Sequence, residues 1–374
     1  MEPMVDERGN KHYILEKIGT DGQGTLYATK NSDIIIRDSE SDNALLYENI
    51  KFLPISGIEK LLLPVDYLEA PNIGYVLNIP EGFVPLSSIS DLKTIGYKRR
   101  LGLLADITKV LVKLHALPVM YGSMSFARIL ISSKAQGPQA SEAYLLYSAK
   151  MDFAMGFIEE MDADPYIAPE AQRGLGGTIA SDSYSFGALA NDLLNGEPMV
   201  QGFQELYERS QGDPPARPKI SEFYRFFLQQ LDLMLSCKKC HADFHYSVKE
   251  CPGCEAAPPK MLKADIYDNI DGNKITRGFK VLEFASNRQC FWNYHTDNVL
   301  LDDKIEPRID CVLNLSGDRK LHLIFKNLMD KEIIINEKKV PAGQGTVVAL
   351  PCEMIRIRFK LYSATERYID MVMV

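Results

Sequence analysis

The sequence lacks the features that would place a protein in a membrane or send it out of the cell. No apolar run reaches the ~18 residues that indicate a membrane-spanning helix, and residues 1–13 contain no apolar core of the kind that a signal peptide needs. We therefore expect a cytoplasmic protein without a membrane partner.

The chain also lacks a net positive charge. The 374 residues include 42 Lys and Arg against 50 Asp and Glu, a formal net charge of -8, and no basic stripe is visible. Because binding to a phosphate backbone requires clustered cations, this composition argues against nucleic acid as a partner. The length exceeds that of a usual single domain, which predicts two or three domains.

Cysteine is too unevenly distributed for a disulfide framework. There are seven cysteines, and four of them lie in the segment CKKCHADFHYSVKECPGC. Their spacing, C-x2-C-x10-C-x2-C, is typical of a structural zinc ribbon, in which each C-x2-C pair supplies two thiolates to one tetrahedral ion. Two disulfides are the alternative, which a cytoplasmic location disfavours. The predicted zinc ligands are Cys237, Cys240, Cys251 and Cys254.

The other cysteines and the two histidines of this segment are not expected to bind metal. His241 and His245 could replace a cysteine ligand, but exposure in a loop is the simpler interpretation. Cys290, Cys311 and Cys352 are scattered among predicted strands, and we expect them to be buried, small apolar side chains.

The sequence pattern changes twice along the chain. Short β-branched runs, separated by Gly, Asn, Asp and Pro, predict strands from Tyr13 to about Leu86, with one helix candidate, NALLYENIKFL. Apolar residues at three- and four-residue spacing then predict helices in RRLGLLADITKVLVKLHAL, SDSYSFGALANDLLNG and SEFYRFFLQQLDLML. Alternating strands return after the cysteine segment, for example in RKLHLIFKNL, KEIIINEKK and GTVVALPCEMIRIRFKLY.

Short motifs occur in a fixed order before the cysteine segment: IGTDGQGTLY, IIIR, YGSMSFARIL, MDFAMGF, APE, SDSYSFG and an Arg-Pro pair. Together with the change from strands to helices, this order resembles that of the protein kinase family. The resemblance implies a multidomain α+β protein with a bilobal kinase-like domain at 10–235. Its small lobe would cover about 10–86 and its large lobe about 87–235, followed by a zinc ribbon at 236–256 and a β-sandwich domain at 262–374.

The resemblance also implies a nucleotide site with altered residues. Its members would be Gly19, Gly22 and Gly24 in a glycine-rich turn over the phosphates, Arg37 in place of a phosphate-pairing lysine, Glu48 as the partner of Arg37, and Asp152 as a magnesium ligand. Arginine does not replace that lysine equivalently, and Asp21 brings a carboxylate to the turn. We therefore expect weak or absent binding of ATP and magnesium. A glycine-rich hairpin without a ligand and an exposed arginine on an edge strand are the alternatives.

The loop at YGSMSFARIL resembles a kinase catalytic loop that has lost its chemistry. Against the pattern H-R-D-L-x-x-x-N, Tyr121 and Gly122 replace the first two residues, and Ser123 replaces the aspartate that accepts the substrate's proton. Arg128 replaces the asparagine that holds a second magnesium ion and brings a positive charge there. Loss of a positioned base costs roughly 10²- to 10⁴-fold in rate. The resemblance thus implies no catalytic residue, with Ser123 and Arg128 as degenerate positions.

Residues that stabilise the large lobe of a kinase are retained. Glu170 of the APE motif and Arg217 are expected to form a buried ion pair, and Asp182 is expected to cap the helix at SDSYSFG. We therefore expect a regulatory or scaffolding pseudokinase in a signalling assembly. One alternative is an atypical active Ser/Thr kinase that uses Asp152, one metal ion and a base from Glu159, Glu160, Asp162 or Asp164. The other is a structural adaptor that binds proteins through its β-rich domain.

Two looser resemblances concern partners and the C-terminal part. A zinc ribbon behind a kinase-like domain is similar in architecture to bacterial kinase-like proteins encoded with a von Willebrand-type protein and a PP2C-type phosphatase, which implies protein partners of those kinds. The stretch KNLMDKEIIINEKKVPAGQGTVVALPCEMIRIRF resembles the last strands of a forkhead-associated domain. The elements with which that family grips phosphothreonine are missing, so a β-sandwich used for protein contact is the simpler interpretation.

Overall fold

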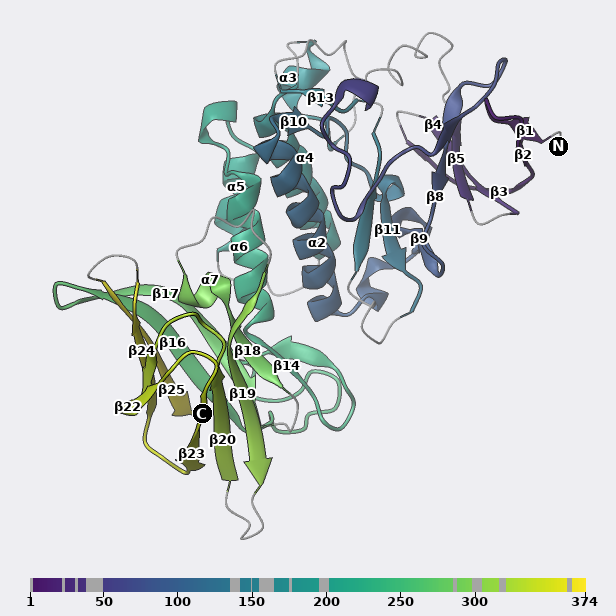
Figure 1. Ribbon diagram of the computed structural model, residues 1–374. Coiled ribbons are helices and arrows are strands. Elements are labelled where there is room, and N and C mark those ends of the chain that lie inside the picture. Colours follow the sequence, from purple (N-terminus) through teal and green to yellow (C-terminus); the bar gives the residue numbers. More distant parts are fainter. Residues whose placement is uncertain are drawn as a thin grey trace. The chain divides into compact units, whose positions relative to one another are not determined.

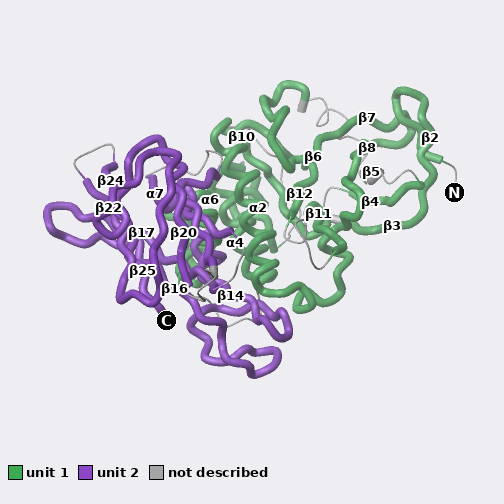
Figure 2. The backbone as a smooth tube through the Cα atoms, turned by 60° about the horizontal axis from the view of Figure 1, so that its bottom comes forward, with its two compact units in different colours: residues 1–227 green, residues 228–374 purple. Residues whose placement is uncertain are grey.

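The chain is mixed α and β, with a β-rich C-terminal part. The computed structural model describes residues 3–21, 24–30, 33–37, 50–134, 142–148, 150–154, 165–174, 177–194, 202–284, 288–297, 305–315, 321–361 and 365–374. It divides the chain into two compact units, residues 1–227 and 228–374 (Figures 1 and 2). We refer to them as unit 1 and unit 2.

Unit 1 begins with strands, as the β-branched runs predicted. An N-terminal hairpin, β1 (Met4–Val5) and β2 (Lys11–His12), precedes a five-stranded antiparallel sheet in the order β3-β4-β5-β8-β7. Its strands are β3 (Ile14–Asp21), β4 (Gly24–Thr29), β5 (Asp33–Arg37), β7 (Asp66–Tyr67) and β8 (Gly74–Asn78). Most of the predicted helix NALLYENIKFL lies outside the described residues, and its end is a short 3-10 turn, η1 (Ile50–Phe52).

The helices of unit 1 follow the apolar spacing of the sequence. They are α2 (Tyr97–Ala116), α3 (Pro169–Gln172), α4 (Ile179–Leu194), α5 (Phe203–Ser210) and α6 (Ile220–Leu231), which runs into unit 2. Phe186 of α4 packs edge-on against Phe223 of α6, with ring centroids 5.2 Å apart. The prediction was wrong at the end of SEFYRFFLQQLDLML, because α6 stops at Leu231 and Met234–Ser236 forms strand β14.

Short strands precede and follow the segment 121–128 of unit 1. A four-stranded sheet has the order β6-β12-β11-β9, with β6 (Leu61–Leu62), β9 (Phe83–Pro85), β11 (Ile129–Ser132) and β12 (Ala143–Leu146). Before the segment, β10 (Val119–Met120) pairs with β13 (Asp152–Phe153). The 3-10 turn η4 (Phe126–Arg128) lies within the segment and contacts a second turn, η2 (Leu86–Ser88). Two further 3-10 turns of unit 1 are η3 (Leu92–Thr94) and η5 (Pro214–Ala216), and η5 lies against α4 and α5.

Unit 2 contains two antiparallel sheets that share one core. The six-stranded sheet has the order β17-β16-β25-β24-β21-β22, from β16 (Met261–Ile270), β17 (Asn273–Glu283), β21 (Ile333–Ile335), β22 (Lys338–Val340), β24 (Ile355–Lys360) and β25 (Glu366–Met373). The four-stranded sheet has the order β18-β19-β20-β23, from β18 (Gln289–Trp292), β19 (Pro307–Leu315), β20 (Leu321–Asn327) and β23 (Gly345–Leu350). Buried side chains of both sheets, such as Ile266, Phe291, Phe325, Ile357 and Ile369, form the shared core.

Turn residues set the strand register in this unit. The turn between β16 and β17 is Asp271-Gly272 and that between β21 and β22 is Asn336-Glu337, and all four residues have positive φ. Two-residue turns of this kind match the twist of paired strands and favour Asn, Asp and Gly. The strands predicted in RKLHLIFKNL, KEIIINEKK and GTVVALPCEMIRIRFKLY are confirmed.

Candidate functional site

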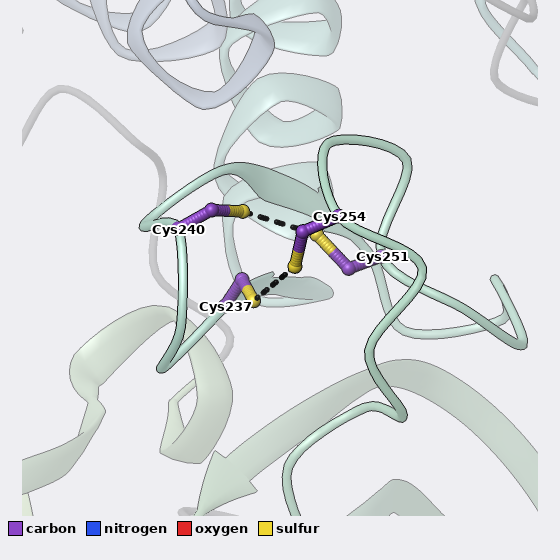
Figure 3. A group of neighbouring side chains, drawn as sticks. All are labelled: Cys237, Cys240, Cys251 and Cys254. Carbon is purple, nitrogen blue, oxygen red and sulfur yellow. Dashed lines mark hydrogen bonds between the residues drawn. The ribbon is translucent and has the colours of Figure 1, made fainter.

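The four cysteines of the two C-x2-C pairs lie together beside the hairpin of β14 and β15 (Asp243–His245) (Figure 3). Their sulfur atoms all lie within 4.8 Å of one another; Sγ of Cys237 is 3.6 Å from that of Cys254, and Sγ of Cys240 is 3.4 Å from that of Cys251. Zinc–sulfur bonds of ~2.3 Å at tetrahedral angles would separate the sulfurs by about 3.8 Å. A disulfide would bring them to about 2.05 Å. The four cysteines are free thiols that could hold a zinc ion.

Both cysteine pairs have the same backbone geometry. In each pair, the amide of the first cysteine donates to the carbonyl five residues later: Cys237 to Ala242 at 2.9 Å, and Cys251 to Ala256 at 2.8 Å. The residue after the second cysteine, His241 or Glu255, has φ near +60° (61° and 57°) and donates to the first cysteine's carbonyl. A Cβ on Gly253 would lie 3.2 Å from the Cys240 sulfur, so glycine leaves room for the sulfur cluster.

Neither histidine of the segment belongs to the sulfur cluster. His241 is exposed, as expected. His245 lies on strand β15 and is half-buried, with Nδ1 2.7 Å from the Ser247 hydroxyl, so its expected place in an exposed loop was wrong. Of the remaining cysteines, Cys290 and Cys311 are buried as expected, and Cys352 is half-buried.

The cysteine segment is packed into unit 2. Cys237, Cys251 and Phe244 share a small core with Met261 of β16 and Val281 of β17. Two hydrogen bonds add to this contact, because the Ser236 amide donates to Glu283 at 2.9 Å and Lys238 Nζ donates to the Phe284 carbonyl at 2.9 Å. A metal ion at this site would therefore stabilise the ends of β16 and β17 as well as the two cysteine pairs.

Asp182 holds the start of the 121–128 segment. One carboxylate oxygen accepts from the Tyr121 amide at 2.6 Å, and the other accepts from the Gly122 amide at 2.9 Å. His115 Nε2 also lies 2.9 Å from this carboxylate, which is buried. The expected helix-capping role of Asp182 was wrong, because Asp182 lies inside the first turn of α4 and the Thr178 hydroxyl accepts from the amides that a cap serves.

The rest of the segment is shaped by close packing. Gly122 has φ +87°, and a Cβ there would lie 2.3 Å from the Lys150 carbonyl oxygen, so a side chain would force the backbone to move. Ser123 is half-buried. Arg128 is fully buried; its Nη1 donates to the Tyr75 hydroxyl at 2.6 Å and to the Tyr147 carbonyl at 3.0 Å. The charge expected to face a metal ion is thus enclosed by protein oxygens.

Of the residues predicted to bind nucleotide, the structure describes Gly19, Gly24, Asp152 and the backbone of Arg37. Gly19 lies on β3, and a Cβ there would be 3.5 Å from the Ser87 hydroxyl and 3.6 Å from the Ala127 Cβ. Asp152 is half-buried on β13 and pairs with Met120, the residue before the 121–128 segment. Arg37 pairs through its backbone with Thr25 and Gly74. Outside the described residues lie Gly22, Glu48, Glu159, Glu160, Asp162 and Asp164.

Glu170 and Arg217 lie against each other in unit 1. Arg217 Nη1 is 2.5 Å from Oε1 of Glu170, and Nη2 is 3.0 Å from Oε2, a two-pronged contact. The side chain of Arg217 is 3% exposed and that of Glu170 is 17% exposed. Burial alone raises the pKa of Glu170, but hydrogen bonds from Arg217 and Ser181 outweigh it, so the pKa lies below its ordinary value.

A buried polar cluster around Asp232 in unit 2 has no counterpart in the motifs read from the sequence. Asp232 accepts from Lys280 and from the Tyr294 hydroxyl at 2.9 Å, and His295 Nε2 lies 2.7 Å away. The Trp292 amide donates to His295 Nδ1 at 3.0 Å, so Nε2 carries the proton and the ring is neutral. Burial lowers the pKa of His295, against the opposing effect of Asp232. Tyr294 and His295 lie on the short helix α7 (Asn293–Thr296), which the sequence pattern did not predict.

Unit 2 is therefore expected to lose stability as the pH falls. A histidine whose folded-state pKa is lowered stabilises the fold above the ordinary value of ~6.5, and this stabilisation is lost below it, by up to about 1.4 kcal/mol per pH unit. Denaturant unfolding followed by the fluorescence of Trp292, the single tryptophan, should show this loss between pH 7 and 5. In His295→Gln, the free energy of unfolding should change less between pH 7 and 5 than in the unmodified protein. His322→Gln is the control and should show the same change as the unmodified protein. Equal slopes in both variants would contradict the assignment.

No protein family model matches the chain, and no curated protein is significantly similar to it in sequence. Within the described residues, no helix is both long and apolar enough to cross a membrane.

Proposed function

We propose that the protein is a kinase-like scaffold that binds partner proteins in a signalling assembly and transfers no phosphate. The segment 121–128 carries this proposal. Asp182 and His115 fix its backbone, while Ser123 offers a neutral hydroxyl where a phosphoryl-transfer enzyme needs a base. The segment keeps a defined shape without the charge that the reaction requires.

One element order and two contacts support the kinase-like part of the proposal. The five-stranded antiparallel sheet precedes the helices, the pairing of β10 with β13 brings Asp152 beside the 121–128 segment, and Glu170 meets Arg217. In this proposal unit 1 corresponds to the two lobes, the four cysteines form a zinc ribbon, and the two sheets of unit 2 form a β-sandwich. A von Willebrand-type protein or a PP2C-type phosphatase would be a partner of the expected kind.

The close approach of Gly19 to Ala127 and Ser87 supports weak or absent nucleotide binding. In a kinase the glycine-rich strand covers the phosphates, so a nucleotide would have to lie between this strand and the loop. Here a Cβ on Gly19 would already be in van der Waals contact with both side chains, so the space between Gly19 and these side chains is no wider than a methyl group needs. A nucleotide would first have to separate them.

The purified protein should show no autophosphorylation and no transfer to a generic protein substrate above the level of an Asp152→Ala variant. The physical reason is the missing base at Ser123, which alone costs roughly 10²- to 10⁴-fold. Radiolabelled ATP with magnesium or manganese provides the measurement, and calorimetric titration with ATP should show no sub-micromolar affinity. Phosphate incorporation by the unmodified protein that disappears in Asp152→Ala would establish an atypical active kinase instead.

A further inference from the structure

We propose that Arg128 is an internal latch that holds the five-stranded sheet of unit 1 against the 121–128 segment, so that this closed arrangement needs no bound nucleotide. The comparison with a nucleotide rests on the proposed function. The latch itself rests only on contacts within unit 1.

The latch is a closed triangle of hydrogen bonds. Nη1 of Arg128 carries two hydrogens and donates to the Tyr75 hydroxyl at 2.6 Å and to the Tyr147 carbonyl at 3.0 Å. The Tyr75 hydroxyl in turn donates to the same carbonyl at 3.1 Å. All three side chains are fully buried, and the two tyrosine rings meet edge-on with centroids 5.2 Å apart. Each bond is therefore made away from water, where its loss is most costly.

The three residues come from different parts of unit 1. Tyr75 lies on β8, an inner strand of the five-stranded sheet, and its backbone pairs with Ile36 and Tyr67. Arg128 ends the turn η4, and Tyr147 follows β12 of the four-stranded sheet. One guanidinium thus joins both sheets to the 121–128 segment.

An independent contact closes the same region. Ala127, the neighbour of Arg128, lies beside Gly19 on β3, the edge strand of the five-stranded sheet. Two places on one sheet therefore lie close to consecutive residues of η4: β8 is bonded to Arg128 through the Tyr75 hydroxyl, and Gly19 of β3 leaves only the room of a methyl group beside Ala127. Movement of the sheet away from the loop would have to break both contacts together.

The chemistry of this position favours arginine. A guanidinium is planar, weakly hydrated for a cation and presents several donors in fixed directions, so one of its nitrogens can donate to two oxygens at once, here those of Tyr75 and Tyr147. A lysine ammonium is more strongly hydrated and would lose more on burial. An alanine would leave a cavity and remove the donor shared by Tyr75 and Tyr147.

Hydrogen exchange measured by mass spectrometry on the unmodified 374-residue chain and its variants tests the latch. In Arg128→Ala, amides of β3, β8 and β11 should exchange about tenfold faster or more, while those of α4 change little, because only the attached elements open. Addition of methylguanidinium should restore their protection. Arg225→Ala removes an exposed arginine of α6 and should leave all of these rates unchanged.

Two milder variants keep the test decisive if Arg128→Ala fails to fold. Tyr75→Phe keeps the ring and removes the hydroxyl, and Arg128→Lys keeps the charge; both should raise exchange in β8 and β11 by a smaller factor. A uniform rise across unit 1, or rates equal to those of Arg225→Ala, would overturn the latch and leave the scaffold proposal standing. Phosphate transfer by the unmodified protein would overturn the scaffold proposal and leave the latch standing.

Discussion

Replacing Cys251 by serine is expected to release a zinc ion and to unfold the segment from β14 to residue 256. The protein as purified should contain about one zinc per chain, held by Cys237, Cys240, Cys251 and Cys254. Apparent binding free energies of structural zinc sites reach about 10 to 16 kcal/mol in small peptides at neutral pH. The core of this segment has six buried residues, and two of them are the cysteines Cys237 and Cys251, so loss of the metal should also loosen the core.

The consequence should extend beyond the cysteine segment. Because Cys237 and Cys251 pack against Met261 and Val281, the adjoining ends of β16 and β17 should also lose protection from hydrogen exchange. Metal content by mass spectrometry and exchange after chelation measure the two effects. Cys352→Ser is the matched control, since this cysteine lies outside the sulfur cluster and should leave zinc in place. Two stoichiometric disulfides in place of zinc would contradict the assignment.

Replacing Glu170 by alanine is expected to destabilise unit 1 by about 3 kcal/mol, because the change leaves the Arg217 charge buried without its carboxylate. The arginine cannot turn to water, since its other donors hold the carbonyls of Gly212 at 2.9 Å and Ala180 at 3.1 Å. Its guanidinium also lies 5.2 Å from the ring centroid of Tyr184. Denaturant unfolding followed by helical circular dichroism measures the change, because most described helices lie in unit 1.

Glu59→Ala provides the control for this experiment. Glu59 pairs with Lys109 at 3.3 Å, but the Glu59 side chain is 64% exposed. Removing this carboxylate should therefore lower the free energy of unfolding by less than about 1 kcal/mol. The pair at Glu170 should also respond to acid: with a lowered pKa, its contribution is present above ~4.5 and is lost as the pH falls below that value. Equal effects of Glu170→Ala and Glu59→Ala would show that the buried pair does not stabilise unit 1.

The cysteine cluster and most strands could be predicted because their signals are local. Each C-x2-C pair is a turn of a few residues, and its spacing alone brings two sulfurs to one point. Period-two alternation in strands and three- and four-residue spacing in helices likewise depend on near neighbours. The Asp271-Gly272 turn carries a local signal of the same kind, which would have located the hairpin of β16 and β17.

Errors arose where a polar side chain finds its partner far along the chain. Asp182 near a helix start indicates a cap, yet its carboxylate binds amides 60 and 61 residues earlier. No sequence pattern predicts the buried cluster around Asp232, because its partners Lys280 and His295 lie 48 and 63 residues further along the chain. Such pairs form only after packing removes water and leaves the charge no other partner.

From the sequence alone one can derive the two strand-rich regions with helices between them and the cluster of four cysteines that could hold a metal ion. The tertiary structure decided what several polar residues do. It enclosed Arg128 between Tyr75 and Tyr147, turned Asp182 toward the 121–128 segment and packed the cysteine pairs onto β16 and β17. The physical reason is that local patterns determine which residues are apolar or close in the chain, whereas burial determines which polar groups must pair.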